Sequence, residues 1–176
     1  MLLQHGLDNF LSKKEFKKLT DIYPRLPLKF NGYVASSDDP LNEEWNWYAT
    51  HTFYSMGKPE SEYCQEVYDM FMPRFRGIGI DRDLSRMKFN CYPRTEILRE
   101  HKSHNDYDHS HQAAIFSLNT CDGFTRLPDG SKANSIANRV IFFDASRYHN
   151  SSTTTTAPAR YNINFNFKSI KRTTSD

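Results

Sequence analysis

Apolar and polar residues alternate one by one in two stretches of the second half of the chain, residues 86–92 and 160–168. Successive side chains of a β-strand point to opposite faces, so each stretch predicts a strand with one apolar and one more polar face. Residues 140–143 are apolar throughout, which is typical of a strand buried on both faces. Residues 113–118 form a fourth, less regular candidate strand.

Helical spacing replaces this alternation in the first half of the chain. Ser12 and Glu15 have the spacing of a capping box, and the apolar residues that follow at helical intervals predict a helix over residues 12–22. Pro59 suits a first helical turn, and the apolar residues after it repeat on one side up to the next proline. This pattern predicts a second helix that begins at Pro59 and ends near Met72.

Helices that precede strands predict an α+β, mainly β fold, in which N-terminal helices pack on one sheet of a small jelly roll. The polar faces of the two alternating strands carry asparagines, which suits a sheet that lines a polar cavity. With 176 residues, the chain fits one domain over 1–176 and is too short for two of ordinary size. We expect helical support over roughly 1–80 and a β core over roughly 84–168.

Residues 25–57 have no clean period, although they carry turn signals and an aromatic cluster over residues 45–54. Their strands cannot be placed from the pattern. The aromatic cluster is a candidate lid over a binding site.

Composition narrows the possible partners only a little. The net charge of +2 is too small to argue for nucleic acid or an anionic membrane as a partner. The chain has no run of about 18 apolar residues and no basic segment before an apolar one, so we expect neither a membrane span nor an export signal. Cys64, Cys91 and Cys121 lack disulfide-framework, metal-binding or redox spacing, which favours an intracellular, cytoplasmic location. The oligomeric state is not indicated.

A cluster of histidines raises the hypothesis of a metal site. Four of the seven histidines fall in one short segment with two aspartates: His101, His104, His109 and His111. Residues two apart on a strand share a face, so His104 and Asp106 can reach one ion. His149, just beyond the candidate strand at 140–143, is a third candidate ligand. Two histidines and a carboxylate on one side of Fe(II) leave three positions for a bidentate oxo-acid and O2.

Two alternatives stay open at this point. His101 is a rival for the first ligand, because His-x-x-His is also metal-compatible spacing, although no aspartate follows it two residues on. Arg160 lies on the asparagine-bearing face of the last strand, where its guanidinium can meet the far carboxylate of a dicarboxylic co-substrate through two parallel hydrogen bonds. A surface arginine at the start of a strand is the other interpretation of Arg160.

Four motifs carry a resemblance to a known family. The chain resembles, in order, the 2-oxoglutarate/Fe(II) oxygenases of the prolyl-hydroxylase-like type at Asn90-Cys91-Tyr92-Pro93, His104-Asn105-Asp106, Asn138 to His149, and Arg160-Tyr161-Asn162-Ile163-Asn164-Phe165. The likeness covers about half of the chain, and the motifs are specific in combination rather than singly.

The resemblance implies a double-stranded β-helix of the jelly-roll, cupin-like kind, with His104, Asp106 and His149 as metal ligands. It implies that Arg160 binds the distal carboxylate of 2-oxoglutarate, and that Tyr92 and Asn90 also touch this co-substrate. The cofactors expected from it are Fe(II), 2-oxoglutarate and O2, and no catalytic residue is needed beyond the metal ligands. The implied activity is that of a dioxygenase that hydroxylates a peptidyl (prolyl-type) or small-molecule substrate and releases succinate and CO2.

Two other functions are considered beside this one. Asn90-x-Tyr92 and Arg160-x-Asn162 also resemble oxidative nucleic-acid demethylases, but Asn166 replaces the second strand arginine of that family, and no basic, aromatic-interleaved stripe occurs. A non-catalytic jelly-roll binding module is the other alternative. The candidate ligand set and Arg160 favour an oxygenase over such a module.

Overall fold

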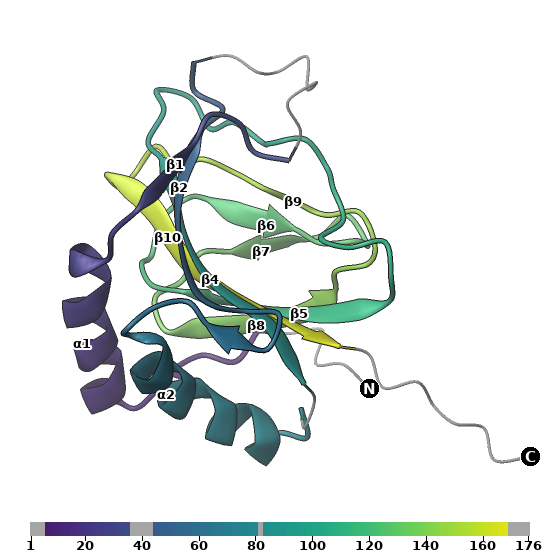
Figure 1. Cartoon of the computed structure of the whole chain (residues 1–176). Coiled ribbons are helices and arrows are strands. Elements are labelled where there is room, and N and C mark those ends of the chain that lie inside the picture. Colours follow the sequence, from purple (N-terminus) through teal and green to yellow (C-terminus); the bar gives the residue numbers. More distant parts are fainter. Residues whose placement is uncertain (1–5, 36–43, 81–82, 169–176) are drawn as a thin grey trace, which may run out of the picture.

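The computed structural model describes residues 6–35, 44–80 and 83–168, and these form two antiparallel sheets with two α-helices (Figure 1). The helices are α1 (Lys13–Ile22) and α2 (Cys64–Gly77), with a short 3-10 helix over Tyr23–Arg25. The strands are β1 (Lys29–Asn31), β2 (Tyr48–Ser55), β3 (Lys58–Pro59), β4 (Leu84–Pro93), β5 (His111–Ser117), β6 (Phe124–Arg126), β7 (Lys132–Asn134), β8 (Arg139–Asp144), β9 (Asn150–Ser151) and β10 (Ala159–Lys168).

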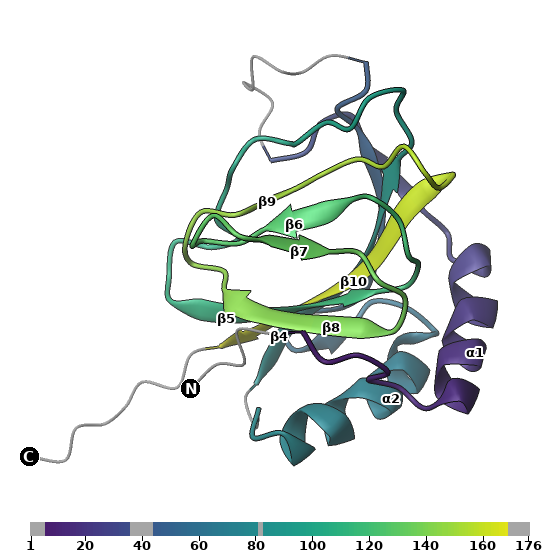
Figure 2. The same cartoon turned by 180° about the vertical axis from the view of Figure 1, so that it is seen from behind.

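The larger sheet has the strand order β1-β2-β4-β10-β5-β8, with β3 paired to β2, and the smaller sheet has the order β7-β6-β9. The helices cover the outer face of the larger sheet, and the smaller sheet lies on its other side (Figures 1 and 2). This is the arrangement of a jelly roll, or double-stranded β-helix, with N-terminal helices on one sheet. The predicted fold class is therefore confirmed.

The four predicted strands are found as β4, β5, β8 and β10, with small shifts of their ends. In β4 and β10, every second side chain enters the core beneath the helices, as Met87 and Phe165 do, each with 0% exposure. In β8, Val140 and Phe142 join that core, whereas Ile141 and Phe143 join a second apolar cluster on the opposite face. The wholly apolar run thus belongs to a strand that is buried on both faces.

Aromatic rings lock α2 to the larger sheet. The ring centroid of Phe71 lies 4.7 Å from that of Phe165 and 4.8 Å from that of Phe116, and Phe75 lies 5.0 Å from Phe165. Aromatic pairs at such distances contribute about 0.5–1.5 kcal/mol each beyond the burial of their area. This core holds the inner face of the sheet in a fixed position relative to the rest of the molecule.

The first helix agrees with its prediction and the second differs at both ends. Ser12 caps α1 with both bonds of the capping box to Glu15. Helix α2 starts at Cys64 rather than at Pro59, because Pro59 lies in β3, which pairs with β2. It also continues through Pro73, where it loses one backbone hydrogen bond. Burial of the next core residue, Phe75, with 0% exposure, offsets that loss.

Helix α2 does not end at Pro73, and its C-terminal turn is closed by Gly79 instead. Gly79 has φ +83°, which a residue without Cβ adopts readily. Its amide donates to the carbonyl of Arg76, and the amide of Ile80 donates to the carbonyl of Phe75, which is the Schellman pattern. Of the helices in the described ranges, none is long and apolar enough to cross a membrane.

The stretch whose strands could not be placed contains β1 and β2. The second part of the aromatic cluster belongs to the sheet: β2 pairs with β4, and the ring of Tyr48 stacks on that of Tyr92 at 5.7 Å. Trp45 and Trp47 precede β2, and a lid formed by the cluster stays a prediction. Trp45 stacks on His101, also at 5.7 Å. The rings of Trp45 and Tyr48 thus pack against other aromatic rings of the molecule.

Asn138 fastens the segment before α1 to the start of β8. It has φ +61°, and its side chain accepts from the amide of Leu11 and donates to the carbonyl of Leu11, both at 2.8 Å. The backbone carbonyl of Asn138 accepts from the amide of Phe10 at 3.0 Å. These bonds set the entry of α1 onto the sheet.

We predict that Asn138→Ala lowers the free energy of unfolding by about 2–4 kcal/mol, because two backbone groups of Leu11 lose their partners and alanine is strained at this φ. Asn138→Gly removes the same hydrogen bonds without the strain, so it should cost less. Urea unfolding of both variants measures the difference. An alanine variant as stable as the wild type would contradict the proposed role of Asn138.

Candidate metal centre

The polar faces of β4 and β10 lie side by side and form the floor of a cavity of about 210 Å³. Their register places Arg160 opposite Tyr92, Asn162 opposite Asn90, Asn164 opposite Lys88 and Asn166 opposite Arg86. The cavity is smaller than the roughly 300–1,000 Å³ of pockets that enclose drug-sized ligands. It therefore suits a small co-substrate together with only part of a larger molecule.

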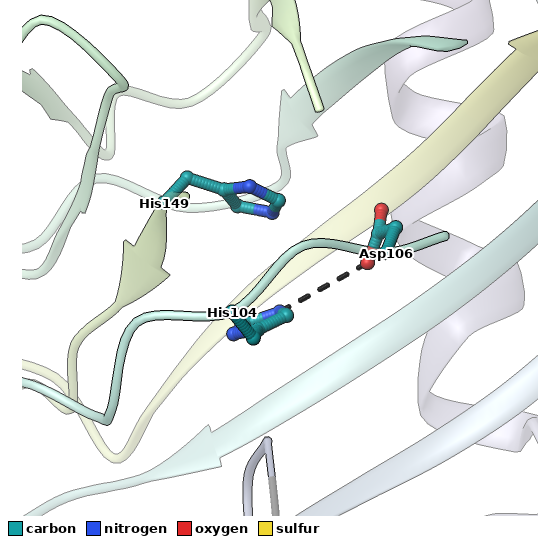
Figure 3. Close-up of side chains that lie close together, drawn as sticks. All are labelled: His104, Asp106 and His149. Atoms are coloured by element: carbon teal, nitrogen blue, oxygen red, sulfur yellow. Dashed lines mark ion pairs between the residues drawn. The ribbon is translucent and has the colours of Figure 1, made fainter. Parts of the chain in front are cut away.

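Three candidate ligands meet at this cavity (Figure 3). The ligand atoms of His104, Asp106 and His149 all lie within 4.8 Å of one another, and His104 Nε2 lies 3.9 Å from Asp106 Oδ1. The three come together from two separate parts of the chain, the loop after β4 and the residue before β9. Two nitrogens and one carboxylate oxygen are a donor set that suits a divalent transition metal.

The expectation that His104 and Asp106 lie on a strand is wrong. His104 makes an isolated antiparallel bridge with His149, through backbone hydrogen bonds of 2.9 and 3.0 Å, and Asp106 follows in a bend. The amide of Asp106 donates to the carbonyl of Ala145 at 3.3 Å. The loop is thus fixed by two contacts with the segment that follows β8, and these orient both side chains without a continuous ladder.

Both histidines present the same nitrogen to the cluster. Nδ1 of His104 lies 3.3 Å from the carbonyl of Lys102, and Nδ1 of His149 lies 3.0 Å from the carbonyl of Arg147. A carbonyl only accepts, so each Nδ1 carries the hydrogen, and each Nε2 keeps a lone pair for a metal. Burial, with the nearby His149, lowers the pKa of His104, which favours the neutral ring that ligation requires.

Asp106 is held ionised by its neighbours. Its Oδ2 accepts from the side-chain amides of Asn166 at 2.7 Å and Asn164 at 3.3 Å, and Arg86 lies 3.2 Å from Oδ1. Burial opposes ionisation, but Arg86, Asn166 and the two histidines outweigh it, so the pKa of Asp106 lies well below its ordinary value. The carboxylate is available to a cation across the neutral pH range.

His101, the rival ligand, is directed elsewhere. Its Nδ1 lies 2.9 Å from Ser151 Oγ, and its ring packs between Trp45 and Tyr92. Burial lowers the pKa of His101 to about 3, so the ring is neutral at pH 7. In the described residues, His104 and not His101 lies with Asp106 and His149. His109 is exposed and His111 begins β5, outside the cluster.

Arg160 is a buried cation with few partners. Its exposure is 1%, Nη2 donates to Thr125 Oγ1 at 2.8 Å, Nη1 lies 3.5 Å from the carbonyl of Ser152, and Nε has no hydrogen-bond partner. No carboxylate of the described residues forms an ion pair with it. Although burial lowers the pKa of Arg160, a guanidinium keeps its proton in proteins.

An unpaired buried charge costs several kcal/mol, and a carboxylate with two parallel acceptors would offset that cost. The environment of Arg160 therefore fits the distal carboxylate of a dicarboxylic ligand. Gly123 allows this placement, because a Cβ there would lie only 2.7 Å from Cδ of Arg160.

Tyr92 and Asn90 both line the cavity, next to Arg160 and its strand neighbours. The guanidinium of Arg160 lies 5.5 Å from the ring centroid of Tyr92, and the Tyr92 hydroxyl bonds with the Ser151 side chain. Asn90 Nδ2 donates to Asn162 Oδ1 at 2.9 Å. Their positions agree with a role in contacting a ligand held by Arg160.

Sequence reasoning missed two cations of the same cavity, Arg86 and Lys88. The signal was present, because both belong to the polar face of the alternating β4 pattern that includes Asn90 and Tyr92. Burial, with the nearby Arg86, lowers the pKa of Lys88 to about 8, which still leaves it mainly protonated at pH 7. Thr125, which comes from the smaller sheet, gave no signal in the pattern.

Solved structures share the fold of this chain, although no protein-family model and no curated protein matches it. An oxidoreductase of the 2OG-Fe(II) oxygenase family from Burkholderia pseudomallei aligns with a TM-score of 0.70 and 11% identity, over 93% of this chain and 84% of its own. A prolyl-4-hydroxylase from Pseudomonas putida aligns with a TM-score of 0.61 and 15% identity, over 94% and 92%.

A prolyl hydroxylase from Trichoplax adhaerens, in complex with a peptide fragment of the hypoxia inducible factor oxygen degradation domain, aligns with a TM-score of 0.57 and 16% identity, over 93% of this chain and 82% of its own. The chain has the fold of the 2-oxoglutarate/Fe(II) oxygenases. The double-stranded β-helix implied by the four motifs is thereby confirmed. Within this oxygenase fold, the cluster of His104, Asp106 and His149 opens onto the cavity between the sheets.

We predict that Asp106 makes stability depend on pH. Its folded-state pKa is depressed, so the ionised carboxylate stabilises the fold above its unfolded pKa of about 3.9, and this contribution is lost as the pH falls below that value. In the presence of a chelator, Asp106→Asn should cost about 1.5–3 kcal/mol at pH 7.

The gap between the two proteins should shrink as the pH falls from about 5 towards 3. Urea unfolding at each pH measures it. A gap that stays constant or widens on acidification would contradict the contacts assigned to this carboxylate.

Proposed function

We propose that this chain is an Fe(II)- and 2-oxoglutarate-dependent dioxygenase that acts as a hydroxylase. One observation carries the proposal: a His-Asp-His cluster lines a small cavity, and a buried arginine with no carboxylate partner among the described residues lies against two residues of its lining, Tyr92 and Thr125. The first fits a divalent metal, and the second fits the far end of a dicarboxylate. The oxygenase fold of the chain supports this combination.

Each group has a separate task in this proposal. His104, Asp106 and His149 hold Fe(II) on one side, through two Nε2 atoms and one carboxylate. Arg160 binds the distal carboxylate of 2-oxoglutarate, and Tyr92 lines the space between. When bound, Fe(II) and 2-oxoglutarate supply an oxidation in which O2 delivers one oxygen to the substrate and one to succinate, with loss of CO2.

The chain contributes binding, orientation and exclusion of water. Backbone carbonyls fix the tautomer of both histidines, and two asparagine amides with Arg86 fix the carboxylate of Asp106. Because these partners are already in place, the ligand atoms need little reorganisation on metal binding. No general acid or base is required of the protein in this scheme.

For the substrate, we propose a peptidyl (prolyl-type) group or a small molecule. The prolyl hydroxylases of this fold, one of them in complex with a peptide, support a peptide. The small cavity suits one side chain of a peptide as well as a small molecule. Neither a nucleic-acid demethylase nor a non-catalytic module gains support from these structures.

We predict that the purified chain releases succinate from 2-oxoglutarate in the presence of Fe(II) and O2, even without a substrate, and that chelation abolishes the release. His149→Ala should lower the rate by more than about 100-fold, since altering the partners of a metal ligand already costs 10–100-fold. Succinate is quantified by mass spectrometry.

His109→Ala is the matched control, because His109 is exposed and lies outside the cluster, so its rate should match the wild type. In the same assay, Arg160→Lys should raise the KM for 2-oxoglutarate about 10–100-fold, because lysine cannot make two parallel bonds. Equal rates in the wild type and His149→Ala would sink the oxygenase proposal.

A further inference from the structure

Lys88 is the cation of the cavity that the proposed reaction does not use. It projects from β4 on the polar face, half-buried, and its Nζ lies 5.4 Å from the ring centroid of Tyr48. Among the described residues, no carboxylate lies within 4.0 Å of that nitrogen. Lys88 nonetheless lines the same cavity as His104 and Asp106.

The neighbouring cation, Arg86, has a carboxylate partner that Lys88 lacks among the described residues. Arg86 donates through Nε to Asn166 Oδ1 at 3.0 Å and pairs with Asp106 at 3.2 Å, and its guanidinium lies 5.2 Å from the ring centroid of Tyr107. Arg86 is therefore a positioning residue for Asp106. Lys88 has a cation–π contact with Tyr48, but among the described residues no carboxylate neutralises its charge.

The charges around the cavity do not balance. Asp106 is the only carboxylate among the described residues that line it. With Fe(II) and 2-oxoglutarate bound, the two negative charges of the co-substrate and that of Asp106 are outweighed by the metal and by Arg86, Lys88 and Arg160. A net positive charge remains in a partly desolvated space, which attracts an anion.

Asn164 adds an acceptor beside this cation. It lies opposite Lys88 in the register of β4 and β10, so both side chains share a face. Because a carboxylate only accepts, Asn164 must turn Nδ2 towards Asp106, and its buried Oδ1 has no hydrogen-bond partner. The pair thus offers one cation and one acceptor next to the candidate metal cluster.

We propose that Lys88 binds the substrate, and that the substrate carries a carboxylate that pairs with Lys88 Nζ and an N–H group that donates to Asn164 Oδ1. This inference rests on the proposed oxygenase function and names its substrate class. A free amino acid and an acidic residue of a peptide share this chemistry. The cavity takes either, the second with the rest of the peptide outside.

Equilibrium dialysis with mass spectrometry tests the proposal on the Fe(II)- and 2-oxoglutarate-loaded protein without O2, so that nothing turns over. The probes are matched pairs in which a carboxamide replaces the only carboxylate: leucine and leucinamide, proline and prolinamide, and two C-terminally amidated decapeptide pools of uncharged residues around a central proline, flanked by glutamate in one and glutamine in the other. The wild type should retain the acid about tenfold better than the amide in at least one pair, which corresponds to about 1.4 kcal/mol.

Lys88→Met should abolish that preference and Lys88→Glu should reverse it. Lys88→Gln serves if the methionine variant does not fold. Lys58→Met, which removes an exposed lysine of β3, should keep the preference. When O2 is then admitted, the retained acid should gain one oxygen. Its amide partner should gain one only to a small extent.

Three outcomes would overturn the proposal: no acid preference in any pair, a preference that survives in Lys88→Met, or a loss of 2-oxoglutarate affinity in Lys88→Met, which would assign Lys88 to the co-substrate. Failure of the proposed oxygenase function would give a different result from failure of the Lys88 proposal. In that case the preference depends on Lys88, but no Fe(II)-dependent succinate appears when O2 is admitted.

Discussion

The antiparallel pairing of β4 with β10 is the interaction on which the rest of this structure depends. Its register places Met87 and Phe165 beneath the helices, and Tyr92 and its partner Arg160 on the face that carries the cavity. A slip of one residue would exchange the two faces and bury the polar groups among phenylalanines. The aromatic contacts of α2 with this sheet therefore determine the position of the candidate site as well as the stability of the fold.

The cavity concentrates charges that a stable core would avoid. Asp106 is compensated by Arg86 and two amides, whereas Arg160 and Lys88 have no carboxylate partner among the described residues. Buried charge of this kind opposes folding, and the apolar face of the same strands offsets it. In the proposed function these groups gain their partners from ligands, which is the usual physical basis of an affinity for anions.

Local patterns predicted much of this architecture. Alternation located β4 and β10, and the capping box located α1. The ends of α2 were not predictable from Pro59 and Pro73. Pro59 belongs to β3, which pairs with β2, and the burial of Phe75 outweighs the backbone hydrogen bond that the helix loses at Pro73. The combination of His104, Asp106 and His149 was identified from spacing and family resemblance. The strand assumed beneath the first two is a loop, which an isolated bridge and one further backbone hydrogen bond hold to the segment after β8. Thr125 reaches Arg160 across the two sheets, a contact that no local pattern encodes.

A crystal structure of the protein grown without O2 in the presence of Mn(II) and 2-oxoglutarate tests the central claim most directly. Anomalous scattering should place one Mn(II) among His104 Nε2, Asp106 and His149 Nε2, with the distal carboxylate of 2-oxoglutarate on the guanidinium of Arg160. A metal bound through His101, or a co-substrate whose distal carboxylate lies on Lys88 instead of Arg160, would contradict this account.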